Sequence, residues 1–61
     1  MNTYNNIKIV AKEQGISINR LEKLAGISKG AIGHWNVISP TVRNLKKVAN
    51  VLGCTVDELL K

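Results

Sequence analysis

Residues 28–36 contain several groups that can bind a negatively charged polymer. Lys29 and His34 stand there beside Gly30 and Gly33. Lysine donates hydrogen bonds to guanine acceptors or to phosphate, and histidine donates or accepts them. A glycine has no side chain, so a backbone that carries one can approach a ligand closely. This combination indicates binding through hydrogen bonds and charge.

Each of these residues also has a simpler interpretation. Lys29 could be a solvated lysine, and His34 a surface residue at a helix end. Two glycines in one short helix each cost roughly 1 kcal/mol relative to alanine, which calls for a reason. Either the backbone approaches base edges and thymine methyls, or Gly33 relieves crowding against a neighbouring helix.

Residue content excludes a Cys/His metal cluster and gives no support for catalysis. The chain has one His and one Cys, so neither an internal disulfide nor a Cys/His metal cluster can form. A general base needs a partner and a pocket, which a helical chain this small offers poorly to His34. We expect no catalytic residue, no metal, no cofactor and no small-molecule substrate.

The charge distribution points to an acidic partner. The 61 residues carry 9 Lys and Arg against 4 Asp and Glu, for a net charge of +5. Between Gly15 and Gly53 a single acid, Glu22, stands among the cations Arg20, Lys23, Lys29, Arg43, Lys46 and Lys47. A solvated basic face is the simpler interpretation, but nucleic acid is the first partner to consider.

No apolar run approaches the roughly 18–20 residues that span a bilayer. The polar residues 1–6 do not form a signal peptide. We therefore expect a cytoplasmic chain with no membrane partner.

Apolar residues recur at helical spacing in five short segments, which predicts an all-α fold. The first three segments have Ile7, Val10 and Ala11, then Ile18, Leu21, Leu24 and Ala25, then Ile32 and Trp35. The last two have Val42, Leu45, Val48, Ala49 and Leu52, then Val56, Leu59 and Leu60. Cys54, between the last two segments, is expected to be a small buried hydrophobe.

Capping residues mark the ends of these segments. Starts are predicted at Ser17, at Ser28, at Ser39 with Pro40 in the first helical position, and at Thr55 with Glu58 as a capping box. Stops are predicted at Gly15, Gly26 and Gly53.

The ordered residues of 17–35, SINRLEKLAGISKGAIGHW, predict a helix-turn-helix. Gly26 tolerates the left-handed backbone that the turn needs, and Ile27 fills the corner. Ser28 would then cap the second helix, while Ile32 and Trp35 would be buried against the first. Leu21 and Ala25 are the inward positions of the first helix.

With this motif, the chain resembles the XRE family of helix-turn-helix regulators, the phage-repressor and Cro type. Two further blocks support the resemblance, SPTVRNLKKVANVLG and the closing TVDELL. It implies a single domain over residues 1–61, a compact five-helix bundle of repressor-like type. It also implies a transcriptional regulator, expected to be a repressor, that binds double-stranded DNA. The third helix, residues 28–35, would enter the major groove. Such proteins often bind palindromic operators as homodimers, and many belong to phages or mobile elements.

The candidate DNA-binding residues combine the outward positions of the third helix with flanking helix starts. They are Ser17, Ser28, Lys29, Gly30, Ala31, Gly33, His34, Asn36 and Arg43.

Three features depart from the family pattern. Many relatives have Gln at the position of Ile18, where it contacts phosphate. Many have Ala at the position of Glu22, so we expect Glu22 to lean toward solvent or to pair with Lys23 or Arg20. The loop of residues 36–39 is short and lacks the glycine often found there.

A rival interpretation is a protein-interaction module on the same fold, such as an antitoxin or a phage anti-immunity partner.

Two further expectations concern the C-terminal end. Val56, Leu59 and Leu60 would leave apolar surface for a weak homodimer. The chain also ends directly after this apolar stretch, which favours a domain cut from a longer regulator, although small complete members of the family exist.

Overall fold

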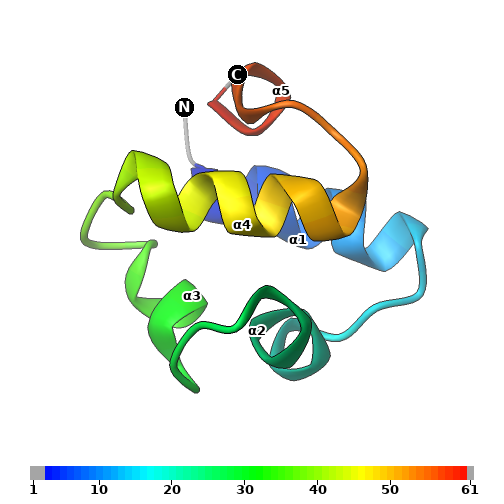
Figure 1. Ribbon diagram of the computed structural model, residues 1–61, viewed down its shortest axis with the longest axis horizontal. Helices are drawn as coiled ribbons and strands as arrows, with labels where there is room; N and C mark the ends of the chain where they lie inside the picture. The colour runs from blue at the N-terminus through cyan, green and yellow to red at the C-terminus, as the bar shows by residue number, and fades with distance from the viewer. Residues whose placement is uncertain (1–2, 61) are drawn as a thin grey trace.

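The computed structural model describes residues 3–60, and within them lie five α-helices and no strand (Figure 1). The helices are α1 (Thr3–Glu13), α2 (Ile18–Ala25), α3 (Ala31–His34), α4 (Val42–Leu52) and α5 (Val56–Leu60). The prediction of an all-α fold with five short helices is confirmed. No helix in the described part of the chain is long and apolar enough to cross a membrane.

Helices α1, α2, α4 and α5 pack against one another in a closed ring of contacts. Helix α4 contacts α2 on one side and α5 on the other, while α1 lies against α5 and α2. The short α3 contacts α2 and lies beside it in Figure 1. Side chains from all five helices, with Trp35 at the end of α3, meet in one core: Ile7, Ala11, Leu21, Ile32, Trp35, Leu45, Val48, Ala49, Leu52 and Leu59. Each large apolar side chain buried there stabilises the fold by about 1.5–3 kcal/mol.

Several predicted helix ends are confirmed. The Ser17 hydroxyl accepts a hydrogen bond from the Arg20 N–H (3.1 Å) and so caps α2. Gly26 ends α2 in the left-handed conformation, with φ of 72°. Thr55 and Glu58 form the capping box of α5, because the Thr55 hydroxyl accepts from the Glu58 N–H and the Glu58 carboxylate accepts from the Thr55 N–H, both at 3.2 Å.

The predicted start of α4 at Ser39 and Pro40 is wrong. The helix begins at Val42, and its N-cap is Thr41, whose hydroxyl accepts from the Asn44 N–H (3.2 Å). Thr41 has the extended backbone that an N-cap needs, with φ of −71° and ψ of 157°. Pro40 thus precedes the cap and is not the first helical residue.

Two apolar residues assigned to inward faces are exposed. Leu24 of α2 is 52% exposed, and Val42 at the start of α4 is 69% exposed. Sequence spacing defines a stripe about 100° wide or more, and the neighbouring helices decide which of its edges is covered. Here the covered edge of α2 holds Leu21 and the covered edge of α4 holds Leu45.

The C-terminal helix is more deeply packed than its sequence indicated. Leu59 is fully buried and Val56 is half-buried, so only Leu60, 43% exposed, offers much apolar surface. Asn6 of α1 fixes this helix by donating a side-chain hydrogen bond to the Leu59 carbonyl (2.9 Å). The expectation of apolar surface is therefore wrong for Leu59, which is fully buried in the core.

Cys54 is half-buried and packs against the core. Burial raises the pKa of its thiol, and the nearby Glu58 carboxylate raises it further. The thiol therefore stays protonated near neutral pH and behaves as a small, nearly apolar side chain. It is less buried than predicted.

Candidate nucleic-acid interface

The turn between α2 and α3 is built as the sequence predicted. Gly26 leaves α2 with a positive φ, and the Ile27 N–H donates back to the Glu22 carbonyl (3.0 Å). This bond closes the last turn of α2 and reverses the chain direction. Ile27 is half-buried against the core at the corner.

The third helix is shorter than the predicted residues 28–35. It spans Ala31–His34, and its N-cap is Gly30 with φ of 86° and no side-chain capping bond. The left-handed backbone at Gly30 is incompatible with a continuous helix from Ser28. Ser28 therefore does not cap α3. Its carbonyl instead accepts from the Ala31 N–H (3.0 Å) in a turn that precedes the helix.

The cap of α3 comes from another helix. Glu22 of α2 is 2% exposed, and its two carboxylate oxygens accept from the start of α3. The Gly30 N–H donates to Oε1 and the Ile32 N–H donates to Oε2, both at 3.0 Å. An anionic acceptor at a helix N-terminus gains from both the free N–H groups and the helix dipole. Glu22 thus supplies the cap that Gly30 lacks.

The expectation that Glu22 leans toward solvent or pairs with Lys23 or Arg20 is wrong. The sequence did carry a signal for its burial, because Ile18, Leu21, Glu22 and Ala25 lie at i, i+3, i+4 and i+7 on one helical stripe. A carboxylate on that stripe must be paired or hydrogen-bonded. Its partners are the backbone amides of the next helix.

The anchor residues of α3 are confirmed. Ile32 is fully buried and Trp35 is buried, and both belong to the core. Ala31 is half-buried, whereas Lys29, Gly33 and His34 are exposed. The predicted outward positions therefore lie on solvent-facing surface, with Ala31 at its edge.

The two glycines at α3 differ in whether the structure requires them. Gly30 needs to be glycine because its φ is 86°. Gly33 has an ordinary helical backbone, and a Cβ placed there would meet no atom within 4 Å. The interpretation that Gly33 relieves crowding against a neighbouring helix is therefore wrong.

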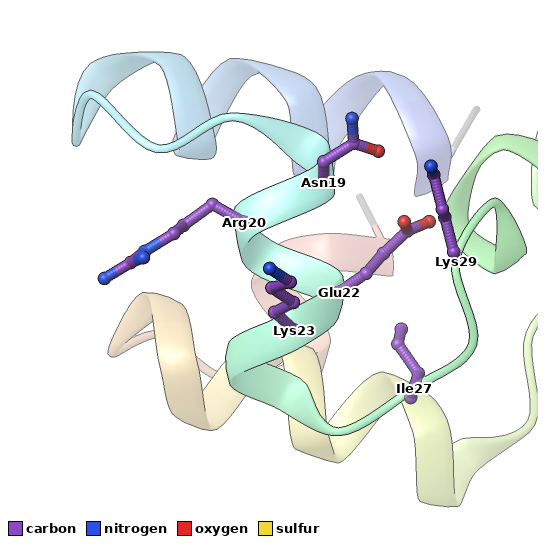
Figure 2. Close-up of a pocket in the computed structure, with 6 residues that line it drawn as sticks. All are labelled: Asn19, Arg20, Glu22, Lys23, Ile27 and Lys29. Atoms are coloured by element: carbon purple, nitrogen blue, oxygen red, sulfur yellow. The ribbon is translucent and has the colours of Figure 1, made fainter.

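A hollow of about 350 Å³ lies between α2 and the segment before α3 (Figure 2). Among its lining residues, only Lys29 was a candidate DNA-binding residue from the sequence, because exposed polar residues on a short helix carry no motif. The lining is Asn19, Arg20, Glu22, Lys23, Ile27 and Lys29. Glu22 points toward the segment carrying Lys29, while Arg20 extends away from it. The hollow is rimmed by cations above a carboxylate that is already hydrogen-bonded.

The remaining candidate residues lie at helix ends. Ser17 precedes α2, Asn36 follows α3, and Arg43 is the second residue of α4. All three are exposed. Ser17 and Arg43 lie at the starts of α2 and α4, apart in sequence from the other candidates. The others follow one another along residues 28–36: Ser28, Lys29, Gly30, Ala31, Gly33, His34 and Asn36.

The comparisons with known proteins agree with this geometry. A helix-turn-helix family model matches residues 7–59, which include all of α2 to α4 and most of α1 and α5. No curated protein matches the chain at a significant level. Because the family match covers most of the sequence, the chain belongs to the XRE-type helix-turn-helix family of DNA-binding regulators.

Proposed function

We propose that this protein is a sequence-specific repressor that inserts α3 into the major groove of double-stranded DNA. The observation that carries this proposal is the two-sided construction of α3. Ile32 and Trp35 fix it to the core, while Lys29, Gly33 and His34 are exposed. The second helix of a helix-turn-helix lies in the major groove with its N-terminal residues at the base edges, and Lys29 is the exposed long donor next to that end of α3.

Gly33 supports close approach of the helix to DNA. Nothing inside the protein occupies the space next to it, so the glycine has no internal packing reason. A base edge or a thymine methyl could lie against the α3 backbone there. Lys29, next to Gly30, would then donate to a guanine acceptor or to a phosphate.

The flanking residues would position the protein on the DNA backbone. Ser17, Ser28, Asn36 and Arg43 are exposed donors, and contacts of this kind set register without reading sequence. The α3 N-terminus itself is a poorer phosphate site than expected, since Glu22 already occupies its amides. Lys29 is therefore the main candidate for charge recognition there.

Selection of bound sequences from a random duplex library would test this proposal. We expect a defined site with two related half-sites and, in a reporter assay, lower transcription when the site overlaps a promoter. Recovery of random sequences would contradict sequence-specific binding. Binding that ignores salt would favour the protein-interaction alternative, because phosphate contacts release counterions.

Lys29→Ala, compared with Lys12→Ala, separates base reading from charge. Both variants lose one positive charge, but Lys12 lies in the last turn of α1. If Lys29 contacts a base edge, its loss should weaken operator binding by about 1–3 kcal/mol and relax specificity at that position. If it contacts phosphate, binding should weaken uniformly and the salt slope should fall by about one.

Lys12→Ala should change operator binding little in either case. Dissociation constants measured at matched salt decide the outcome. Equal binding of the two variants to the operator would place Lys29 outside the interface.

A further inference from the structure

The third helix does not hold its own position. It has four residues, begins at a glycine with no side-chain cap, and contains a second glycine, Gly33. Isolated helices much longer than this are marginal in water. Its orientation must therefore come from contacts with the rest of the fold.

Two kinds of contact fix α3. Ile32 and Trp35 hold it by burial, which is not directional. Glu22 holds it by two directed bonds, one from each carboxylate oxygen, to the Gly30 and Ile32 amides. A carboxylate that accepts two N–H groups sets both the distance and the rotation of the peptide planes that it meets.

We infer that Glu22 is a positioning residue for DNA recognition, which fixes the backbone from which Lys29, Gly33 and His34 face the DNA. This inference rests on the proposed function. Glu22 is itself 2% exposed, and both of its carboxylate oxygens already accept backbone hydrogen bonds, so we assign it no direct contact with DNA. It acts through the register of the segment that begins at Gly30.

Because Glu22 is negatively charged, an experiment can distinguish its positioning role from a general electrostatic effect on DNA binding. Removal of a carboxylate makes the protein more positive, so general attraction to DNA should stay equal or increase. Loss of positioning should instead weaken binding to the specific site. The two effects have opposite signs.

Glu22→Gln is the first test. A glutamine has one acceptor oxygen, so one backbone N–H would face a side-chain NH₂ instead of an acceptor. We expect operator affinity to fall by about 10-fold, as for the loss of a charged hydrogen bond. Affinity for random duplex should be unchanged or higher at the same salt.

Glu58→Gln is the matched control. It also removes one negative charge, from an exposed side chain in the capping box of α5, where glutamine can serve as well. We expect operator and random duplex to respond alike. The ratio of the two affinities should therefore fall in Glu22→Gln and stay constant in Glu58→Gln.

Amide hydrogen exchange in the free protein tests the positioning directly. Whichever of the Gly30 and Ile32 amides faces the glutamine NH₂ should exchange about 10-fold faster in Glu22→Gln, because it loses its fixed acceptor. The Leu45 and Val48 amides in α4 should not change. Unchanged exchange at Gly30 and Ile32, or an unchanged affinity ratio, would overturn the inference.

Glu22→Asp covers the case in which Glu22→Gln does not fold. It keeps the charge but is one methylene shorter, so one carboxylate cannot reach both amides. A lower affinity ratio with an intact cooperative melt would support positioning. If both variants lose the melt, Glu22 serves the whole fold and the inference is overturned. If the wild-type protein binds operator and random duplex equally, the proposed function itself fails.

Discussion

At the scale of single residues, Gly30 and Gly33 show how the same amino acid serves two needs. Gly30 adopts a left-handed backbone that only glycine takes without strain. Gly33 adopts an ordinary helical backbone and has open space beside it. The fold therefore requires a glycine at position 30, but it does not require one at position 33.

Gly33→Ala should therefore separate stability from binding. Alanine stabilises a helix relative to glycine, so we expect unfolding free energy to rise by about 0.5–1 kcal/mol. We expect operator affinity to fall, because the new methyl group would stand between α3 and the DNA. Chemical denaturation and a DNA titration on the same preparation measure the two effects.

Gly30→Ala is the contrasting variant. It places alanine at a φ of 86°, so we expect a loss of about 1–2 kcal/mol in stability.

A Gly33→Ala protein that binds the operator as tightly as wild type would show that the α3 backbone does not approach the DNA there.

At the scale of helices, the sequence predicts caps between residues that are close along the chain, but not caps between residues of different helices. The caps at Ser17 and Thr55 join residues three apart, so the sequence alone predicts them. The Glu22 cap joins residues eight and ten apart across a turn. The Glu22 cap forms only after α2 and α3 have packed, and no short sequence motif predicts it.

The same reasoning explains the two helix starts that were predicted wrongly. Ser28 and Ser39 have the right residue type, but the backbone that follows decides whether a helix begins. At Gly30 the chain turns left-handed, and after Pro40 it stays extended through Thr41. The candidate DNA-binding face could be predicted because Ile32 and Trp35 define its opposite side.

Trp35→Ala should remove the larger anchor of α3. Truncation of a buried aromatic costs about 3–5 kcal/mol. Domains have about 0.05–0.15 kcal/mol of stability per residue, so a chain of this length would lose most of it. We expect loss of the cooperative thermal melt in circular dichroism, and loss of DNA binding with it.

Val37→Ala is the control for the thermal melt of the free protein. Val37 lies two residues further along and is 87% exposed, so the change should stay within about 0.5 kcal/mol. A Trp35→Ala protein that melts like this control would mean that the tryptophan contributes little to the core.

At the scale of the whole molecule, size argues for two copies on DNA. The longest dimension of the Cα trace is 23 Å. Half-sites read by paired helix-turn-helix units lie about 34 Å apart, one helical turn. One copy therefore spans less than the distance over which a palindromic operator is read.

Most of the exposed large apolar side chains lie outside the C-terminal helix. Val37, Ile38 and Val42 are each more exposed than Leu60. These three side chains lie in the α3–α4 connection and at the start of α4. We expect them to contribute to the contact between copies, together with Leu60.

Val42→Ser tests this pairing. It should weaken binding to a duplex with two half-sites by about 3–10-fold, as expected for one apolar side chain at an interface. Binding to a single half-site should not change. Leu60→Ser with the larger effect would instead assign the contact to the C-terminal helix, and one protomer on a full operator would contradict pairing altogether.

The way in which α3 is attached also bears on how binding preference could be reprogrammed. Its attachment uses the buried Ile32 and Trp35 and the backbone amides that meet Glu22. The exposed positions 29, 33 and 34 take no part in it. A combinatorial library randomised at those three positions should therefore consist mostly of folded proteins, from which new operator preferences could be selected without redesign of the scaffold.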